Sequence, residues 1–464
     1  MSTYAEVETV KAYLAAKALA AAERMKNAQI GQDFLDGDRY AIREYLKEDL
    51  EKTFSEDDVK AMHLVWINLI PKIVKRLSML YKTPPKRSIG DKSNESLDQA
   101  LRVTGYDRAL LEAHRGAKFH NTVLMGALPD GRGSVRHVIL RPNLTYVEPD
   151  PDDYTRIKWL KYPMMREVNG KEIIVWSFWS DEEHFWRNEN GAEIPVPNQK
   201  DNRNPYGINP FGPVRILTQN DFWGDGMMDL VDANRAINFL ITSALVENIV
   251  MSAYGTPFGV NLDLGDEIKF GPRHAVTIDG VTDDMKDPKL EFVTSETFTS
   301  EISEVIEWLH KVQGTVKGLP ASAFSQVEQT LSGYAKLIDN MELLEDREEE
   351  VPLFQDFERN YLTRFAKVWN VAAKGQKSIP EDYSDLSISF GKIRFPENML
   401  DITRRRRMEA ETGTKNEIDW IMEDHPGMTR EKAIEYWKLR EKERLDLKLA
   451  VRGNAPDSDN MPEE

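Results

Sequence analysis

Cysteine is absent from the 464 residues of this sequence. Disulfide bonds, thiolate zinc sites and cysteine nucleophiles are therefore excluded. Long uninterrupted apolar runs are missing too, because the best candidate, residues 227–251, contains Asp229, Asp232, Arg235 and Glu247. A membrane-spanning helix needs about 20 predominantly apolar residues, so the sequence predicts no such helix.

Basic residues are outnumbered by acidic ones. The chain has 61 Lys and Arg against 78 Asp and Glu, a net charge of −17. A protein that binds a DNA sequence tightly usually carries a basic surface, so the charge disfavours that role but still allows a surface past which DNA moves. Hydrophobic residues make up 41% of the chain, enough for a large core, and the length predicts about two to four structural units.

Catalytic motifs are also missing. The sequence has no G-x-x-x-x-G-K-[ST] phosphate loop, no G-x-S-x-G and no H-E-x-x-H. The acidic clusters at 148–153 and 263–267 could bind a divalent cation, but the prolines at 149 and 151 favour a solvated turn over the first cluster. We expect no catalytic residue, no metal and no cofactor.

Hydrophobic periodicity divides the first half of the chain into helical and mixed parts. Helical patterns cover 4–29, 56–82 and 96–118, and Pro71 predicts a kink in the second of them. Between 122 and 186, short strand-like runs alternate with turn signals such as Asn-Gly pairs, which predicts a small α+β unit.

The second half is mostly helical. Residues 227–251 are apolar on nearly every side, which predicts a helix buried on several faces or packed between subunits. Strand-like pieces follow over 256–295, and Pro352 predicts a kink that divides a very long helix over 331–374. The run Arg404–Arg407 spreads around its helix, so we expect salt bridges within the chain or to an acidic neighbouring subunit. Further helical patterns cover 299–313, 398–412, 415–423 and 429–450.

Several stretches, taken in this order, resemble the portal proteins of tailed bacteriophages and prophages. The resemblance covers about residues 30–450. The stretches are DFLDGDRYAIREYL, NLIPKIVKRLSMLYKTPPKR (68–87), NPFGPVRIL (209–217), GDGMMDLVDANRAINFLITSALVEN (224–248), ETFTSEISEVIEWLHKVQGTVKGLP (296–320), TLSGYAKLI (330–338) and SISFGKIRFPENMLDITRRRRMEAETGTKNEIDWI (387–421).

The resemblance implies a mainly α fold with an α+β wing, a two-helix stem, a small α/β clip, a long kinked helix and a helical crown. The implied parts are a wing (1–225, returning at 375–403), stem helices (226–251 and 298–313), a clip (252–297), a channel loop (314–332), the long helix (333–374), and a crown with a disordered tail (404–464).

The resemblance further implies a homo-oligomeric ring, usually of twelve subunits, at one capsid vertex. Such a ring conducts double-stranded DNA during packaging and ejection. It docks the large terminase and then a head–tail adaptor, and it contacts the major capsid protein and a scaffold. The family is not enzymatic. Its members belong to the virion and, during assembly, to the host cytoplasm.

The same resemblance assigns roles to individual residues. The channel loop presents candidate DNA contacts, the clip presents candidate docking aromatics, and the first stem helix presents an oligomer interface. These residues are Lys317, Gln326, Glu328 and Gln329 in the loop, Phe258, Phe270 and Phe292 in the clip, and Leu230, Ile237, Leu240, Leu245 and Ile249 in the stem.

Two other classes of function compete with the portal. One is a metal-dependent nuclease or phosphotransferase that uses the acidic clusters, and it requires carboxylates that converge on a cation. The other is a monomeric helical scaffold protein, and it requires the stem helices to be buried within one chain. A ring seen in solution would separate the portal from both.

Overall fold

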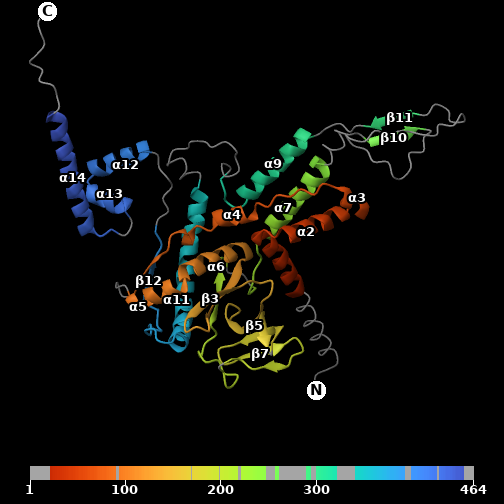
Figure 1. The fold of residues 1–464 in the computed structure, drawn as a ribbon, viewed down its shortest axis with the longest axis horizontal. Helices are drawn as coiled ribbons and strands as arrows, with labels where there is room; N and C mark the ends of the chain where they lie inside the picture. Colours follow the sequence, from red (N-terminus) through yellow and green to blue (C-terminus); the bar gives the residue numbers. More distant parts are fainter. Residues whose placement is uncertain are drawn as a thin grey trace, which may run out of the picture. The chain divides into compact units, whose positions relative to one another are not determined.

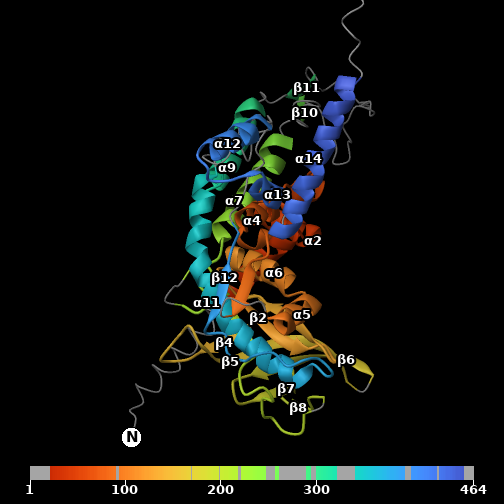
Figure 2. The same ribbon diagram turned by 90° about the vertical axis from the view of Figure 1, so that its left-hand side faces the viewer.

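The described residues fall into two compact units, which Figures 1 and 2 show in two views at right angles. The first contains the described residues up to 320 together with 340–391, and the second contains those from 399 to 453. The computed structural model describes residues 21–89, 94–168, 170–197, 199–217, 221–246, 256–260, 289–293, 299–320, 340–391, 399–425 and 428–453.

The N-terminal part of the first unit is helical, as the sequence predicts. Residues 21–36 form a helix that ends at Gly37, whose φ of 71° favours glycine. The carboxylate of Asp38 then caps the next helix by accepting the backbone N–H groups of Tyr40 and Ala41. The following helices are α2 (Arg39–Glu51), α3 (Glu56–Ala61), α4 (Ile70–Leu77), η1 (Leu80–Lys82), α5 (Glu95–Thr104) and α6 (Tyr106–His120).

The prediction of one helix over 56–82 is wrong. α3 ends at Ala61, and residues 62–69, which we call the strap, form no helix before α4 begins. Burial alternates along the strap, which is typical of extended chain. Pro71 lies in the first turn of α4, where its missing N–H costs nothing, and does not kink a helix. The side chains packed in an apolar cluster are Met62, Leu64 and Trp66, and the exposed ones are Val65 and Ile67.

A three-stranded antiparallel sheet lies at the centre of the first unit. Its order is β3-β2-β9, formed by Val135–Leu140, Thr122–Pro129 and Phe211–Arg215. Alternate side chains of β2 enter two different cores. One core, with Met125, includes side chains of α6 and of α11 (Met341–Ala372), and the other, with Leu124, includes side chains of a second sheet. This central sheet therefore has helices on one face and strands on the other.

The second sheet has five antiparallel strands in sequence order. Its hairpins turn at Gly170 and Gly191, with φ of 75° and 80°, where the Asn-Gly signals predict turns. The predicted α+β unit is confirmed. The strands are β4 (Tyr146–Pro149), β5 (Ile157–Val168), β6 (Lys171–Trp179), β7 (His184–Asn188) and β8 (Glu193–Ile194).

The long helix α11 closes the core, and Figure 2 shows it as one helix beside β2. It runs through Pro352 as a single helix, so the predicted division there is wrong. Extensive burial of its side chains on both sides of the proline outweighs the local cost of proline in a helix.

A buried carboxylate fixes α11 to the N-terminal elements. Glu358 accepts hydrogen bonds from Tyr81 Oη at 2.8 Å and Arg87 Nε at 2.6 Å. Burial raises the pKa of Glu358, and the guanidinium of Arg87 opposes that rise. Arg87 lies on β1 (Lys86–Ile89), which pairs antiparallel with β12 (Leu386–Ser389). The chain after α11 thus returns to the N-terminal elements of the first unit.

The other elements are two helices around a hairpin and a second helical unit. Within the described residues, no helix is long and apolar enough to cross a membrane. The elements are α7 (Met228–Leu240), the π-helical turn η2 (Ile241–Val246), the antiparallel strands β10 (Thr256–Val260) and β11 (Lys289–Val293), α9 (Thr299–Thr315), α12 (Met399–Glu411), α13 (Glu417–Asp424) and α14 (Arg430–Gly453).

The close contact between two paired strands of the central sheet, β2 and β9, predicts the effect of adding one methyl group. A Cβ atom at Gly126 on β2 would lie 2.2 Å from the ring of buried Phe211. We expect Gly126→Ala to lower the free energy of unfolding by about 1–3 kcal/mol, measured by urea denaturation. Gly391→Ala is the control, because its Cβ would meet nothing within 4 Å. Equal denaturation midpoints for both variants would refute the proposed packing.

Candidate assembly site

The two helices around the hairpin pack side by side, as Figure 1 shows, and an apolar seam joins them. Asp229, in the first turn of α7, binds Lys317, just beyond the end of α9, with Oδ2 and Nζ 2.7 Å apart. The two helices are therefore antiparallel, and we call α7, η2 and α9 the stem. The seam joins Ile237 and Ile241 to Ile306, flanked by Leu240, Leu245, Ile302 and Leu309.

Three polar side chains of the stem hold the strap. Asn238 Oδ1 accepts the backbone N–H of Ile67 at 2.9 Å, and Asn234 donates to the carbonyl of the same residue at 2.8 Å. Thr242 both donates to the carbonyl of Val65 and accepts its N–H. We call this set of hydrogen bonds the clasp.

The spacing of the clasp follows from backbone geometry. Four residues of an α-helix rise about 6 Å, and two residues of extended chain span about 6.6 Å. Polar side chains at every fourth position of α7 and η2 therefore match alternate residues of the strap. Asn234, Asn238 and Thr242 are nearly fully buried, so these groups replace water for the strap backbone.

A second contact fixes the stem to α2. The guanidinium of Arg235 donates to both carboxylate oxygens of Asp49, at 2.8 and 2.7 Å. Burial tends to raise the pKa of Asp49, but hydrogen bonds from Arg235 and Lys52 outweigh it and lower the pKa. Phe239 on the same helix packs into the apolar cluster of α2, α3 and the strap.

These contacts correct the argument about the first stem helix. Leu230 and Ile237 are 2% and 1% exposed within one chain, because α9, the strap and α2 surround α7. The prediction that neighbouring subunits must cover these two residues is therefore wrong. Leu240 and Leu245 are partly buried in the seam, and Ile249 lies outside the described residues.

The exposed apolar side chains of this region lie elsewhere. On α9, Val305 is 48% and Trp308 60% exposed, and on the strap Val65 is 40% and Ile67 41% exposed. The sequence pattern predicts no contact with a partner for these residues. One signal in the sequence could have identified them. Trp308 stands among glutamates, on a different face of its helix from Ile302, Ile306 and Leu309.

The channel-loop and clip candidates are only partly within the described residues. α9 includes Gly314 and ends at Thr315, so the predicted loop starts later than 314. Lys317 is engaged by Asp229, whereas Gln326, Glu328 and Gln329 lie outside the described residues. Phe258 and Phe292 lie on β10 and β11, where Phe258 faces Glu291 in the register and Phe292 faces Pro257. Phe270 lies outside the described residues.

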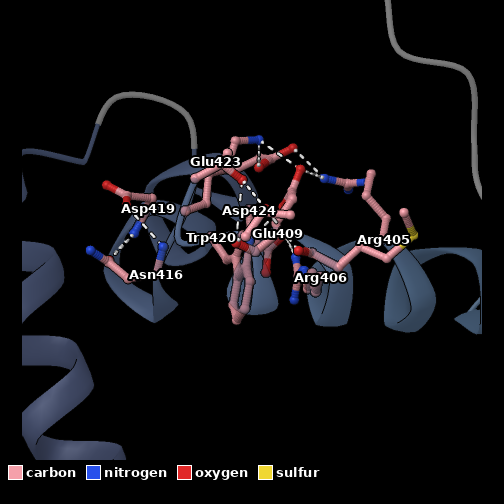
Figure 3. Close-up of polar contacts among 12 residues, drawn as sticks. Arg405, Arg406, Glu409, Asn416, Asp419, Trp420, Glu423 and Asp424 are labelled. Atoms are coloured by element: carbon pink, nitrogen blue, oxygen red, sulfur yellow. Dashed lines mark hydrogen bonds and ion pairs between the residues drawn. The ribbon is translucent and has the colours of Figure 1, made fainter.

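The arginine run of the second unit binds acids of that same unit, as Figure 3 shows. Arg405 contacts Glu409 and Glu423, at 3.1 and 3.4 Å. Arg406 pairs with Asp424, and Arg407 with Glu411. Of the two predicted kinds of partner, acids of the same chain or of a neighbouring subunit, these three arginines bind acids of the same chain.

Glu409 is the centre of this network. It accepts Trp420 Nε1 at 2.7 Å and also contacts Arg405 and Lys415. Burial tends to raise the pKa of Glu409, but the hydrogen bonds from Trp420, Arg405 and Lys415 lower it below the ordinary value. α13 has no fully buried residue, so charge pairs contribute much of the contact between α12 and α13.

The comparison with solved structures finds similar chains, and the other two comparisons find none. No protein family and no curated protein matches the chain. Among solved structures, the chain is similar to one described as the neck of an empty GTA particle computed with C6 symmetry. The identity is 12% and the TM-score 0.35, over 78% of this chain and 91% of that one.

The clasp predicts a stability effect at Asn238. Asn238→Ala leaves the N–H of Ile67 without its acceptor, so we expect a loss of about 1–3 kcal/mol in the free energy of unfolding. Urea denaturation measures it, with Asp232→Ala at an exposed position of the same helix as control, expected within about 0.5 kcal/mol. Matching losses in the two variants would mean that the clasp contributes nothing.

The charged network predicts a pH dependence in the second unit. Because the pKa of Glu409 is lowered in the folded state, its contribution is complete above the ordinary glutamate pKa of about 4.3 and disappears as the pH falls through the lowered value. At neutral pH we expect Glu409→Gln to speed hydrogen exchange in residues 399–425. Glu411→Gln, whose carboxylate is 62% exposed, should not. Unchanged exchange in both would contradict the role of Glu409.

Proposed function

We propose that this chain is the subunit of a phage portal ring, the conduit through which DNA enters and leaves a capsid. The observation that supports this most is the antiparallel stem with the β10–β11 hairpin between its two helices. That order of elements is the one implied for the stem and clip by the sequence resemblance. The clasp and the Arg235–Asp49 pair attach the stem, the proposed channel wall, to the N-terminal helices.

The charge of the chain suits a conduit. Each cation that neutralises a DNA phosphate adds salt-sensitive affinity, so a wall rich in free lysine and arginine would hold DNA in place. The chain is acidic overall, and Lys317, the cation of the proposed channel loop, is already paired with Asp229. Contact with DNA at this point is therefore weak and indifferent to sequence.

The proposed role is mechanical and not enzymatic. In this proposal the ring of copies sits at one capsid vertex, contacts the major capsid protein and a scaffold, and is part of the virion. The hairpin end docks the large terminase, whose ATPase drives packaging, and later a head–tail adaptor. Twelve copies is the number that the sequence resemblance implies.

The alternatives are supported less well. In the acidic turn, Asp150 and Asp153 accept backbone N–H groups two residues ahead, which favours a solvated turn over a nuclease metal site. The scaffold alternative needs the first stem helix to be buried within one chain, and Leu230 and Ile237 are buried in that way. Exposed Trp308 on the second stem helix favours an assembly.

Light scattering and negative-stain microscopy of the purified chain test the proposal. We expect closed rings with a central hole. Replacing 256–295 by a Gly-Ser linker should leave the rings intact and abolish terminase binding, because the stem, wing and strap remain. Replacing 454–464 by the same Gly-Ser linker is the control. This variant should keep both ring formation and terminase binding. A stable monomer at micromolar concentration would exclude the portal.

A further inference from the structure

Two exposed surfaces of the first unit combine apolar side chains with charges of opposite sign. Surface A, on α9, consists of Glu301, Glu304, Val305 and Trp308. Surface B consists of Val65 and Ile67 of the strap with Lys72, Lys75 and Arg76 of α4, the helix that directly follows the strap.

Surface A is one continuous strip. Its residues follow the spacing i, i+3, i+4 and i+7, which places them on one face of a helix. The seam with α7 uses Ile302, Ile306 and Leu309, so this strip is not part of it. Trp308 is 60% exposed, and tryptophan is the kind of side chain that dominates binding energy at protein interfaces.

Surface B is basic in a chain that is acidic overall. Lys72, Lys75 and Arg76 share the exposed face of α4, whereas Ile70, Ile73 and Val74 are buried. None of the three cations forms a salt bridge with another described residue of the chain. Burial, and then the positive charges of Arg76, Arg115 and Lys75, lower the pKa of Lys82 nearby. Such a cluster of like charges favours an anionic partner.

We propose that surface A of one copy docks on surface B of the next copy around the ring. This inference rests on the proposed function and specifies the subunit contact. A ring needs two different surfaces that bind head to tail, whereas a two-fold dimer pairs a surface with itself. Self-pairing would bring glutamates against glutamates or lysines against lysines. Pairing A with B joins opposite charges and covers the apolar residues of both.

Duplex DNA is the competing partner for surface B, since phosphates also bind lysine and arginine. DNA contacts would leave Val65 and Ile67 unexplained, and they would give surface A no partner. The second copy accounts for both surfaces, so it is the partner we favour.

Mixing two defective full-length chains tests head-to-tail docking. Trp308→Asp removes surface A, and Ile67→Asp removes surface B. Each variant alone should be a monomer by light scattering, while an equimolar mixture should form a dimer, because one intact A meets one intact B. Val103→Asp, at a 58% exposed position of α5, is the matched control and should still form rings. Circular dichroism verifies that each variant is folded.

The outcomes separate this inference from the portal proposal. If the wild type and both single variants form rings, the two surfaces are refuted and the portal proposal stands. The same holds if the wild type forms rings and the folded variants stay monomeric when mixed. A monomeric wild type would refute both.

A charge exchange gives an independent test. Lys75→Glu with Arg76→Glu should abolish rings, and adding Glu301→Lys with Glu304→Lys to the same chain should restore them. Titration of a fluorescent DNA duplex measures the competing partner. If the first pair of substitutions abolishes duplex binding and leaves rings intact, surface B is a DNA contact and the inference is overturned.

Discussion

The clasp between the stem and the strap is the contact that organises the first unit. An extended segment cannot satisfy its own backbone, and here the amides and hydroxyl of one helix satisfy it instead. Because four residues of helix and two residues of extended chain have nearly the same length, three side chains of the stem can bind the backbone of the strap. The clasp also fixes which face of the strap is buried, and so it leaves Val65 and Ile67 outside.

Local features of the fold can be predicted from the sequence. Ser55 caps its helix as its sequence position predicts, and Asn-Gly pairs mark the turns of the second sheet, because a cap or a turn depends on a few neighbouring residues. The strap cannot be predicted in this way. Its acceptors on the stem lie as many as 177 positions away in the sequence, and an apolar run without its partner resembles a helix.

In the candidate site, too, the sequence predicts local features but not the long-range contacts. Apolarity identifies the first stem helix as buried, but it does not say what buries it, and the answer is the chain itself. The arginine run of the second unit is similar, since its partners Glu423 and Asp424 lie on a different helix. Which charges are neutralised within the chain and which stay available decides where partners bind, and only the folded arrangement shows this.

The pairing of β1 with β12 has a consequence for biosynthesis. Tyr81 and Glu358, which meet beside it, are 277 positions apart. A ribosome therefore completes the stem and its hairpin before α11 and β12 emerge to cover α6 and β2. Until then the apolar face of the central sheet is open on the nascent chain. Contacts of such long separation form slowly, so an incomplete chain exposes apolar surface until α11 has been synthesised.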